Sequence, residues 1–300
     1  LKKAARIGIA EELQKRVKKI ITGNQVNLKN DYKIFWKDSP IAKIRKGKNY
    51  LSPEIEIIAD EALNLQSKDD LASFLKNWLD NHILEELHDL INLTKFKNKN
   101  QYLRALAYQL YEKNGVLKRS QVKDIVSAIS KEDRRELKNL GIKIGRYHIF
   151  LPKMLKPKAV SLRILLWKFY NNIQNSNEIP KSGLNFLIDN NNKFNSNFLL
   201  LCGFEKFNTF YVRVDILEKL FIQIIEKTEK GKFKINSNMM NLLGSSKENF
   251  FKLITLMNYR KESGQDDTFF YTGEKKFRKK SGFIYQKNSP FKKLSSLKLK

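Results

Sequence analysis

The 300-residue chain has one cysteine, six prolines and no long apolar run. Because a disulfide needs two cysteines, Cys202 alone excludes an internal disulfide framework and also a four-cysteine zinc site. No stretch of about 18 apolar residues is present, so the sequence predicts no membrane span. The first segment, 1–21, is basic and amphipathic and lacks the apolar region and cleavage site of a secretory signal. A reducing cytoplasm is therefore the predicted setting.

The motifs that bind and hydrolyse nucleotides are also missing. A phosphate-binding loop ends in Gly-Lys-Ser or Gly-Lys-Thr. The Gly-Lys pairs of this chain, Gly47-Lys48 and Gly231-Lys232, instead precede asparagine and phenylalanine. An acidic box of the DExD/H type is absent as well. We therefore expect no catalytic activity from this chain alone and no bound cofactor.

The histidines and paired acids predict neither a metal site nor a catalytic site. His82 and His88 are six positions apart, which places them roughly 120° apart around a helix and does not match HExxH spacing. His148 lies in an apolar run without an accompanying nucleophile, which predicts a hydrogen-bonded core histidine. Asp266 and Asp267 are adjacent, so they point apart on any regular element.

Acidic residues are the scarcer charged type, with 31 Asp and Glu against 58 Lys and Arg and a formal net charge of +27. Such an excess favours a polyanionic partner, most simply nucleic acid, because cations that neutralise phosphates release counterions. Residues 1–50 carry 14 basic and 4 acidic side chains, and the last thirty residues carry 10 basic and 1 acidic side chain. Residues 51–130, in contrast, carry 10 basic and 12 acidic side chains. Lysine enrichment by an AT-rich genome is the alternative explanation. The uneven distribution favours a nucleic-acid-facing role for at least one end.

The apolar pattern predicts a mainly α-helical protein, with helical accessory domains, a small β-hairpin and a few short strands. Residues 1–50 are predicted to form a basic helix and a hairpin around the turn Lys37–Pro40. Pro53 favours a helix start at Ser52, within a helical accessory domain at 51–170. The further predicted divisions are an asparagine-rich loop at 171–197, a second helical subdomain at 198–265 and a basic, disordered tail at 266–300.

Polar residues before apolar runs predict where several helices begin. Ser67 and Ser120 are each predicted to cap a helix, since a serine hydroxyl can accept a hydrogen bond from the first turn. Ser130, three residues before Asp133, predicts a capping box. The intervening stretch 102–111 is helical by pattern and is followed by Gly115, a helix-ending residue.

The stretch from Leu140 to Trp167 carries the densest set of local signals. Gly141 is typical of the position just past a helix, and 147–151 form an apolar run suited to a buried strand. Pro157 is predicted at the first turn of a helix whose residues are apolar nearly all round.

The same residues resemble the C-terminal region of bacterial helicases related to the mitochondrial degradosome RNA helicase, which are superfamily 2, DEAD/DEAH-like enzymes. The pattern in that group is LG-x-x-x-G, then FLP-x-LLKP, then LR-x-LLW. It corresponds here to Leu140-Gly141 with Gly145, to Phe150 through Pro157, and to Leu162 through Trp167. Two further blocks, 203–220 and 289–298, fit the same family.

This resemblance implies a C-terminal accessory, nucleic-acid-binding region of an ATP-dependent RNA helicase, without the motor. ATP and magnesium would belong to the full-length helicase only. The implied partners are single-stranded RNA or another nucleic acid, the helicase core of the same polypeptide and a nuclease, without a membrane and in a bacterial cytoplasm. The first residue, Leu1 instead of Met, is what truncation of a longer helicase predicts.

Two clusters of cations with aromatic neighbours are the predicted nucleic-acid-binding residues, because cations hold a phosphate backbone and aromatic rings stack bases. The first lies at the strand-to-helix turn and consists of Arg146, Tyr147, Lys153, Lys156, Lys158 and Arg163. Lys156 and Arg163 share nearly one helical stripe and are the leading candidates. The second lies in the tail and consists of Lys275, Lys276, Arg278, Lys279 and Lys280. A charged rim over a packed turn and a solvated tail are the alternatives.

Two other functions remain open at the level of sequence. The chain could be a protein–protein scaffold that docks a helicase core or a nuclease. It could also be a stand-alone DNA-binding protein that uses 235–259, where two short helices flank Leu243–Ser246 in the outline of a helix-turn-helix. The second of these helices is rich in Phe and Leu, which favours packing in a core.

Overall fold

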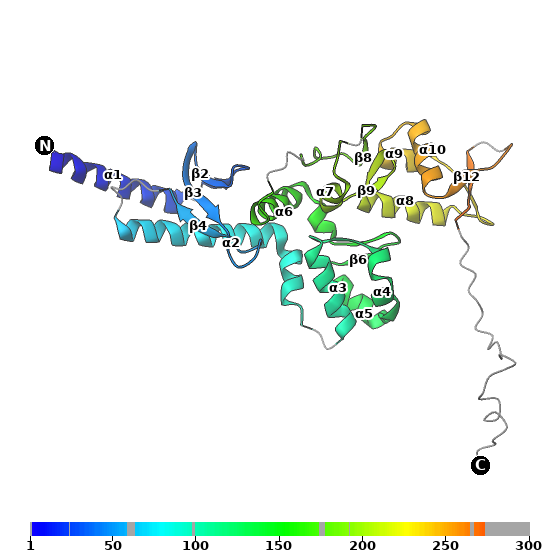
Figure 1. Ribbon diagram of the computed structural model, residues 1–300, viewed down its shortest axis with the longest axis horizontal. Coiled ribbons are helices and arrows are strands. Elements are labelled where there is room, and N and C mark those ends of the chain that lie inside the picture. The colour runs from blue at the N-terminus through cyan, green and yellow to red at the C-terminus, as the bar shows by residue number, and fades with distance from the viewer. Residues whose placement is uncertain are drawn as a thin grey trace, which may run out of the picture.

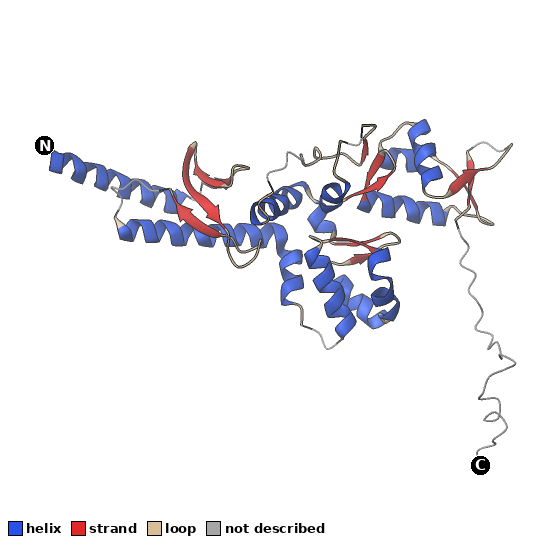
Figure 2. Ribbon diagram, in the orientation of Figure 1, coloured by secondary structure: helices blue, strands red, loops and turns tan. Residues whose placement is uncertain are grey.

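The computed structural model describes residues 2–23, 25–58, 64–97, 100–173, 178–191, 193–264 and 267–273. About 52% of the chain is helical and 19% is strand, and the described strands all pair in small antiparallel sheets (Figure 2). The protein is therefore mostly helical with several small sheets, as the apolar pattern predicts.

Figure 1 shows an elongated arrangement with α1 at one end and α10 and β12 at the other, while α3, α4 and α5 lie below the line of the other elements. The helices are α1 (Lys2–Gly23), α2 (Leu65–Lys95), α3 (Gln101–Glu112), α4 (Lys123–Ala128), α5 (Lys131–Asn139), α6 (Pro157–Tyr170), α7 (Ser196–Leu201), α8 (Val214–Glu226), α9 (Ser237–Leu243) and α10 (Lys247–Leu256). Two single 3₁₀ turns are η1 (Arg119–Val122) and η2 (Pro152–Leu155). The strands are β1 (Val26–Leu28), β2 (Lys33–Trp36), β3 (Ser39–Arg45), β4 (Glu54–Ile57), β5 (Val116–Lys118), β6 (Lys143–Ile144), β7 (His148–Phe150), β8 (Phe186–Ile188), β9 (Phe204–Phe207), β10 (Phe210–Arg213), β11 (Lys232–Lys234), β12 (Tyr259–Lys261) and β13 (Thr268–Tyr271).

The N-terminal part is a four-stranded sheet, in the order β1-β2-β3-β4, that packs with α1 and the first half of α2. The predicted hairpin is present as β2 and β3. The predicted helix start at Ser52 is wrong, because the following residues form β4 and pair with β3. The alternation of acidic and apolar residues in β4 suits a strand, since Glu56 faces Lys43 while Ile55 and Ile57 pack against the core.

Helix α2 connects this sheet to the central helices. Asn64 caps it and accepts a hydrogen bond from the backbone of Ser67 at 2.8 Å, so the cap lies three residues before the predicted one. Its leucines at 71, 75 and 79 are buried, and the helix is interrupted at Leu87, which has φ −117° and ψ 22°. α2 packs against α3 and α6 in the central apolar cluster.

The central part contains α3 to α6 around a three-stranded sheet in the order β5-β7-β6. Ser130 and Asp133 form the predicted capping box of α5, and Gly141 follows that helix at φ +80°. Pro157 occupies the first turn of α6, also as predicted. Ser120 lies inside the 3₁₀ turn η1 and does not cap α4.

Arg163 lies on the buried side of α6 and is 0% exposed. Its guanidinium donates hydrogen bonds to the carbonyl oxygen of Asn114 at 2.8 Å and to that of Met154 at 3.1 Å. Asn114 directly follows the C-terminal end of α3, where the helix dipole is negative, so the buried cation faces partial negative charge. Burial lowers the pKa of Arg163 to about 10, which leaves it charged at neutral pH.

The C-terminal part contains two three-stranded sheets, in the orders β8-β10-β9 and β11-β13-β12, with α8, α9 and α10 packed against them. The helix pair predicted at 235–259 is α9 and α10, separated by Gly244 at φ +66° and capped by Ser246. Phe250 and Leu253 of α10 are 0% exposed. One face of the second helix is therefore part of the core, as its apolar residues predict.

Two predicted boundaries differ from the fold. β8 lies inside the segment 171–197 that was expected to be a loop, and β13 lies inside the expected tail 266–300. β13 is ordered because it is the central strand between β11 and β12, where Phe269 is buried. The tail cations Lys275, Lys276, Arg278, Lys279 and Lys280 lie outside the described residues.

Replacing Arg163 with methionine should destabilise the protein by about 3 kcal/mol, because two buried carbonyl oxygens then lose hydrogen bonds from a charged donor. Urea unfolding measures this change. The matched control is Lys158→Met, at an exposed position on the same helix, which should change stability by less than about 0.5 kcal/mol. Equal effects of the two substitutions would show that Arg163 has no special structural role.

Candidate nucleic-acid interface

A cleft of about 500 Å³ lies where the β5-β7-β6 sheet meets β9. It is lined by Lys118, Arg119, Ser120, Lys123, Arg146, Tyr147, His148, Glu205 and Phe207. The lining residues come from the end of β5, from η1, from the start of α4, from the turn between β6 and β7 with the first residue of β7, and from β9. Four of them are Lys or Arg, and two are aromatic, which is the combination that holds single-stranded nucleic acids.

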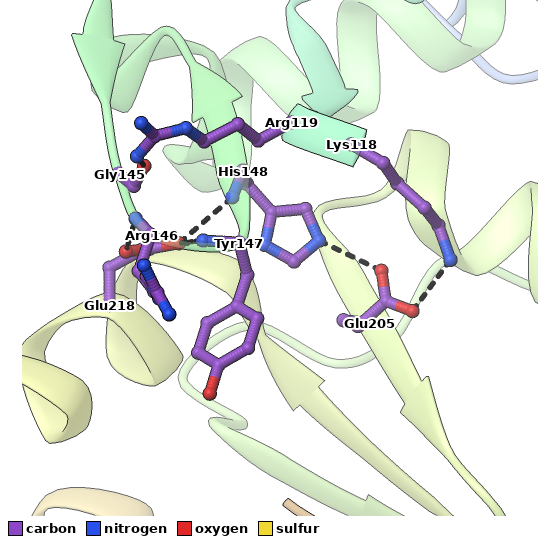
Figure 3. Close-up of polar contacts among 8 residues, drawn as sticks. All are labelled: Lys118, Arg119, Gly145, Arg146, Tyr147, His148, Glu205 and Glu218. Atoms are coloured by element: carbon purple, nitrogen blue, oxygen red, sulfur yellow. Dashed lines mark hydrogen bonds and ion pairs between the residues drawn. The ribbon is translucent and has the colours of Figure 1, made fainter. Parts of the chain in front are cut away.

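The carboxylate of Glu218, on α8, is inserted into the turn between β6 and β7 (Figure 3). It accepts three hydrogen bonds from backbone N–H groups, those of Arg146 at 2.5 Å, Tyr147 at 2.7 Å and His148 at 2.9 Å. Successive N–H groups that point inward form an anion-binding nest. This contact, which we call the Glu218 clamp, joins the central and C-terminal parts of the chain.

Gly145 makes the Glu218 clamp possible. A Cβ atom at this position would overlap the carboxylate of Glu218. The absence of a side chain therefore lets the two groups approach closely. This is the structural role of the second glycine in the LG-x-x-x-G pattern.

His148 lies between two carboxylates. Its Nε2 is 2.8 Å from Glu205 Oε2, and its Nδ1 is 3.7 Å from Glu218 Oε1, which is too long for a hydrogen bond. Burial lowers the pKa of His148, but the carboxylates of Glu205 and Glu218 raise it by more, so the net shift is above the ordinary 6.5. The prediction of a hydrogen-bonded core histidine is confirmed, since its side chain is 2% exposed.

The two carboxylates have lowered pKa values. For Glu205, burial raises the pKa, while His148 and Lys118 lower it by more; the Lys118 Nζ lies 2.6 Å from Glu205 Oε1. For Glu218, burial again raises the pKa, and His148 with the three backbone N–H groups lowers it by more. Both acids are thus ionised at neutral pH and compensate the cations at the base of the cleft.

The cations differ in how firmly they are held. Arg119 donates a hydrogen bond to the carbonyl oxygen of Gly145 at 2.7 Å, which positions it at the β6–β7 turn. Arg146 is exposed and lies over the ring of Phe221 at 5.5 Å, as a cation–π contact. Lys123 is also exposed, and within the described part of the chain neither Lys123 nor Arg146 forms an ion pair. Their charges are available to a ligand.

Tyr147 supplies the aromatic surface beside these charges. Its ring meets that of Phe221 edge to face at 5.5 Å. Its pKa is raised, first by burial and then by the nearby hydroxyls of Tyr259 and Tyr271. The hydroxyl therefore stays protonated and can donate a hydrogen bond.

The structure separates the residues predicted at the strand-to-helix turn. Arg146 and Tyr147 line the cleft. Lys153, Lys156 and Lys158 are exposed but do not line it; Lys153 pairs with the buried Asp89 at 3.0 Å. Arg163 is wrong as a nucleic-acid contact, because it is fully buried and its donors bind backbone carbonyls.

Sequence reasoning missed the cations Lys118, Arg119 and Lys123 and the aromatic Phe207. The sequence around Ser120 was interpreted as a helix cap only. Local patterns could not connect it with the β6–β7 turn about 25 residues later, because only β5–β7 pairing brings Lys118 opposite His148. A cation-rich run, Lys118-Arg119, next to a predicted turn was the available signal.

No protein-family model, no curated protein and no solved structure matches this chain. Among the described residues, no three or more His, Cys, Asp and Glu side chains gather in a way that could hold a metal ion. The helices in the described ranges lack the combined length and apolar character that crossing a membrane requires.

Gly145→Ala should destabilise the protein by about 2 kcal/mol, because the added methyl group pushes the Glu218 carboxylate out of the turn. Thermal and urea unfolding measure the loss. Gly8→Ala is the control, since a Cβ at that helical position meets nothing within 4 Å, and it should be neutral or slightly stabilising. If the stability of the Gly145→Ala protein were unchanged, the proposed role of Gly145 in the Glu218 clamp would be wrong.

The charge network should also make stability depend on pH. The raised pKa of His148 contributes stability that is complete below pH 6.5 and is lost as the pH rises through the folded-state value. The lowered pKa values of Glu205 and Glu218 contribute stability above pH 4.5 that is lost as the pH falls through their folded-state values. The network therefore contributes most to the free energy of unfolding between pH 4.5 and 6.5.

His148→Gln should accordingly reduce the free energy of unfolding most near pH 6, with a smaller deficit toward pH 9. Urea unfolding across this range measures the difference from wild type. When His148→Gln is made in a Glu205→Gln background, the resulting loss of stability should depend less on pH. The reason is that Glu205, one of the two carboxylates that raise the pKa of His148, is then absent. A deficit independent of pH in the wild-type background would exclude a charged His148.

Proposed function

We propose that the chain binds single-stranded nucleic acid, and RNA in particular, in the cleft between the β6–β7 turn and β9. The single observation that carries this proposal is the convergence of Lys118, Arg119, Lys123 and Arg146 with two aromatic side chains in one cleft. The excess of basic over acidic residues supports it, since phosphate neutralisation supplies most of the affinity in such sites.

The character of the cleft favours a single strand over a duplex. Tyr147 and Phe207 present aromatic surface within the cleft, and bases must be unpaired and turned outward to stack on it. RNA is favoured over DNA by the resemblance to degradosome-type helicases.

On this proposal the chain acts as the accessory, non-motor region of an ATP-dependent RNA helicase of the degradosome type. It would hold the strand beside the motor, which would supply the ATP and magnesium chemistry. The chain itself has no proposed catalytic residue. Its cleft residues bind and orient the strand, with Lys123 and Arg146 at phosphates and Tyr147 at a base.

A second candidate function is docking to a helicase core or a nuclease. Ile222 and Ile225, which share a face of α8, are 45% and 56% exposed. Exposed apolar residues at this spacing are typical of a helix that packs against a partner. A docking scaffold predicts little salt-dependent affinity for RNA.

The double substitution Lys123→Gln and Arg146→Gln should weaken binding of a fluorescein-labelled oligouridine by about 10-fold at low salt. The slope of log K against log salt should fall by about 1.4, which corresponds to two lost phosphate contacts. Fluorescence anisotropy over a potassium chloride series measures both quantities.

The matched control is Lys156→Gln with Lys158→Gln, which removes the same charge from exposed positions outside the cleft. At about 0.15 M salt it should leave the affinity within about 2-fold of wild type, because a Debye length of about 8 Å leaves only contacts near the strand. An equal loss of RNA affinity in the two double variants would show that binding depends on general surface charge and not on the cleft. Absence of RNA affinity in the wild-type protein would reject the proposal.

A further inference from the structure

We propose that the outer face of the β11-β13-β12 sheet is a second stacking surface for the same single strand, centred on Phe270. This inference rests on the proposed function and extends it, because it names where the strand continues after the cleft. We call this face the sheet platform and define it by Lys232, Lys234, Arg260, Thr268 and Phe270.

Strand register places these side chains side by side. Phe270, on the central strand β13, pairs with Lys232 of β11 and with Arg260 of β12. A second row follows two residues away, where Thr268 pairs with Lys234. Since side chains alternate between the two faces of a sheet, all five residues of the platform share one face. An aromatic ring is thus flanked by a cation on each side.

The opposite face of this sheet is the one that packs in the core. Phe233 and Phe269 are 2% and 1% exposed and belong to the C-terminal apolar cluster. Phe270 alternates with Phe269, is only half-buried and is a member of none of the apolar clusters among the described residues. Its ring is therefore not needed to fill the core.

The charge of the platform suits a phosphate backbone. Lys232 pairs with Glu262, at the end of β12. Within the described residues, Arg260 and Lys234 have neither a hydrogen bond nor an ion pair through their side chains, and both are exposed. The platform thus offers two free cations beside one aromatic ring, the arrangement with which sheet surfaces hold single strands.

The sheet that carries the platform lies near the cleft, because Tyr147 packs against the apolar cluster that contains Tyr259 and Phe269. Tyr259 and Tyr271 are cross-strand partners with rings 5.2 Å apart, and Tyr271 is 46% exposed. Each tyrosine directly precedes or follows a platform residue in its strand. Because Tyr259 and Tyr271 alternate with Arg260 and Phe270, they lie on the face of the sheet opposite the platform, and a strand leaving the cleft past Tyr147 passes around this sheet to reach Phe270.

The test compares short and long oligouridines, because only the long one can occupy both surfaces. Lengths of about 5 and about 15 nucleotides fit the site sizes of comparable single-strand-binding domains. The variant Phe270→Leu keeps an apolar side chain but removes the aromatic face. It should weaken binding of the long oligonucleotide by roughly 5-fold or more, as expected for loss of one stacked base, and leave the short one unchanged.

Two further variants make the outcome specific to stacking. Phe270→Tyr should retain wild-type affinity for the long oligonucleotide, since tyrosine stacks as phenylalanine does. Tyr108→Leu removes an aromatic side chain that is 60% exposed on α3 and belongs to neither surface; it should change nothing. Circular dichroism and urea unfolding verify that each variant is folded.

The outcomes distinguish this inference from the proposed function. If Phe270→Leu binds the long oligonucleotide as wild type does, the platform is rejected while the cleft stands. If Phe270→Leu weakens the short and long oligonucleotides equally, the effect comes through the cleft and the platform is also rejected. If the wild-type protein binds neither oligonucleotide, the proposed function itself fails.

Discussion

The position of the Glu218 carboxylate inside the β6–β7 turn is the constraint on which the rest of the arrangement depends. One acid satisfies three backbone donors at 2.5–2.9 Å and so replaces the water that an exposed turn would bind. The contact joins α8 to a turn some 70 residues earlier. It thereby fixes Arg146 and Tyr147 relative to α8, while His148 and Lys118 bond Glu205 of β9 directly.

Buried charge in this protein is balanced locally. His148 shares its environment with Glu205 and Glu218, and Lys118 completes the set at the base of the cleft. Removing one member of such a network leaves an uncompensated charge, which costs more than the pair contributes when intact. The network therefore links β5 and β7 to β9 and α8. It also lets exposed cations gather above it, because the two carboxylates offset part of their mutual repulsion.

The 140–167 stretch, which is the most distinctive part of the sequence, has mainly architectural roles in the structure. Gly145 leaves room for the Glu218 carboxylate, and Pro157 begins α6. Arg163 donates hydrogen bonds to one carbonyl oxygen just after α3 and to another in η2. Arg146 and Tyr147 of this stretch line the cleft, but the other lining cations, Lys118, Arg119 and Lys123, lie at the end of β5, on η1 and at the start of α4. The stretch that carries the family pattern noted in the sequence thus mainly builds the scaffold, and most of the proposed binding cations lie beside it.

Local signals in the sequence were sufficient for the elements whose causes lie within a few residues: the capping box of Ser130 and Asp133, the left-handed Gly141, the proline start of α6 and the α9–α10 pair. They failed where pairing across the chain decides the outcome. Glu54–Ile57 became a strand because β3 was available, and β13 became ordered between β11 and β12. Arg163 carries the same charge as its exposed neighbour Lys158, and only packing of α6 against α3 buries it. The cleft likewise required tertiary structure, since β5–β7 pairing and the Glu218 contact bring together residues separated by up to about 90 positions, and no local pattern encodes such a distance.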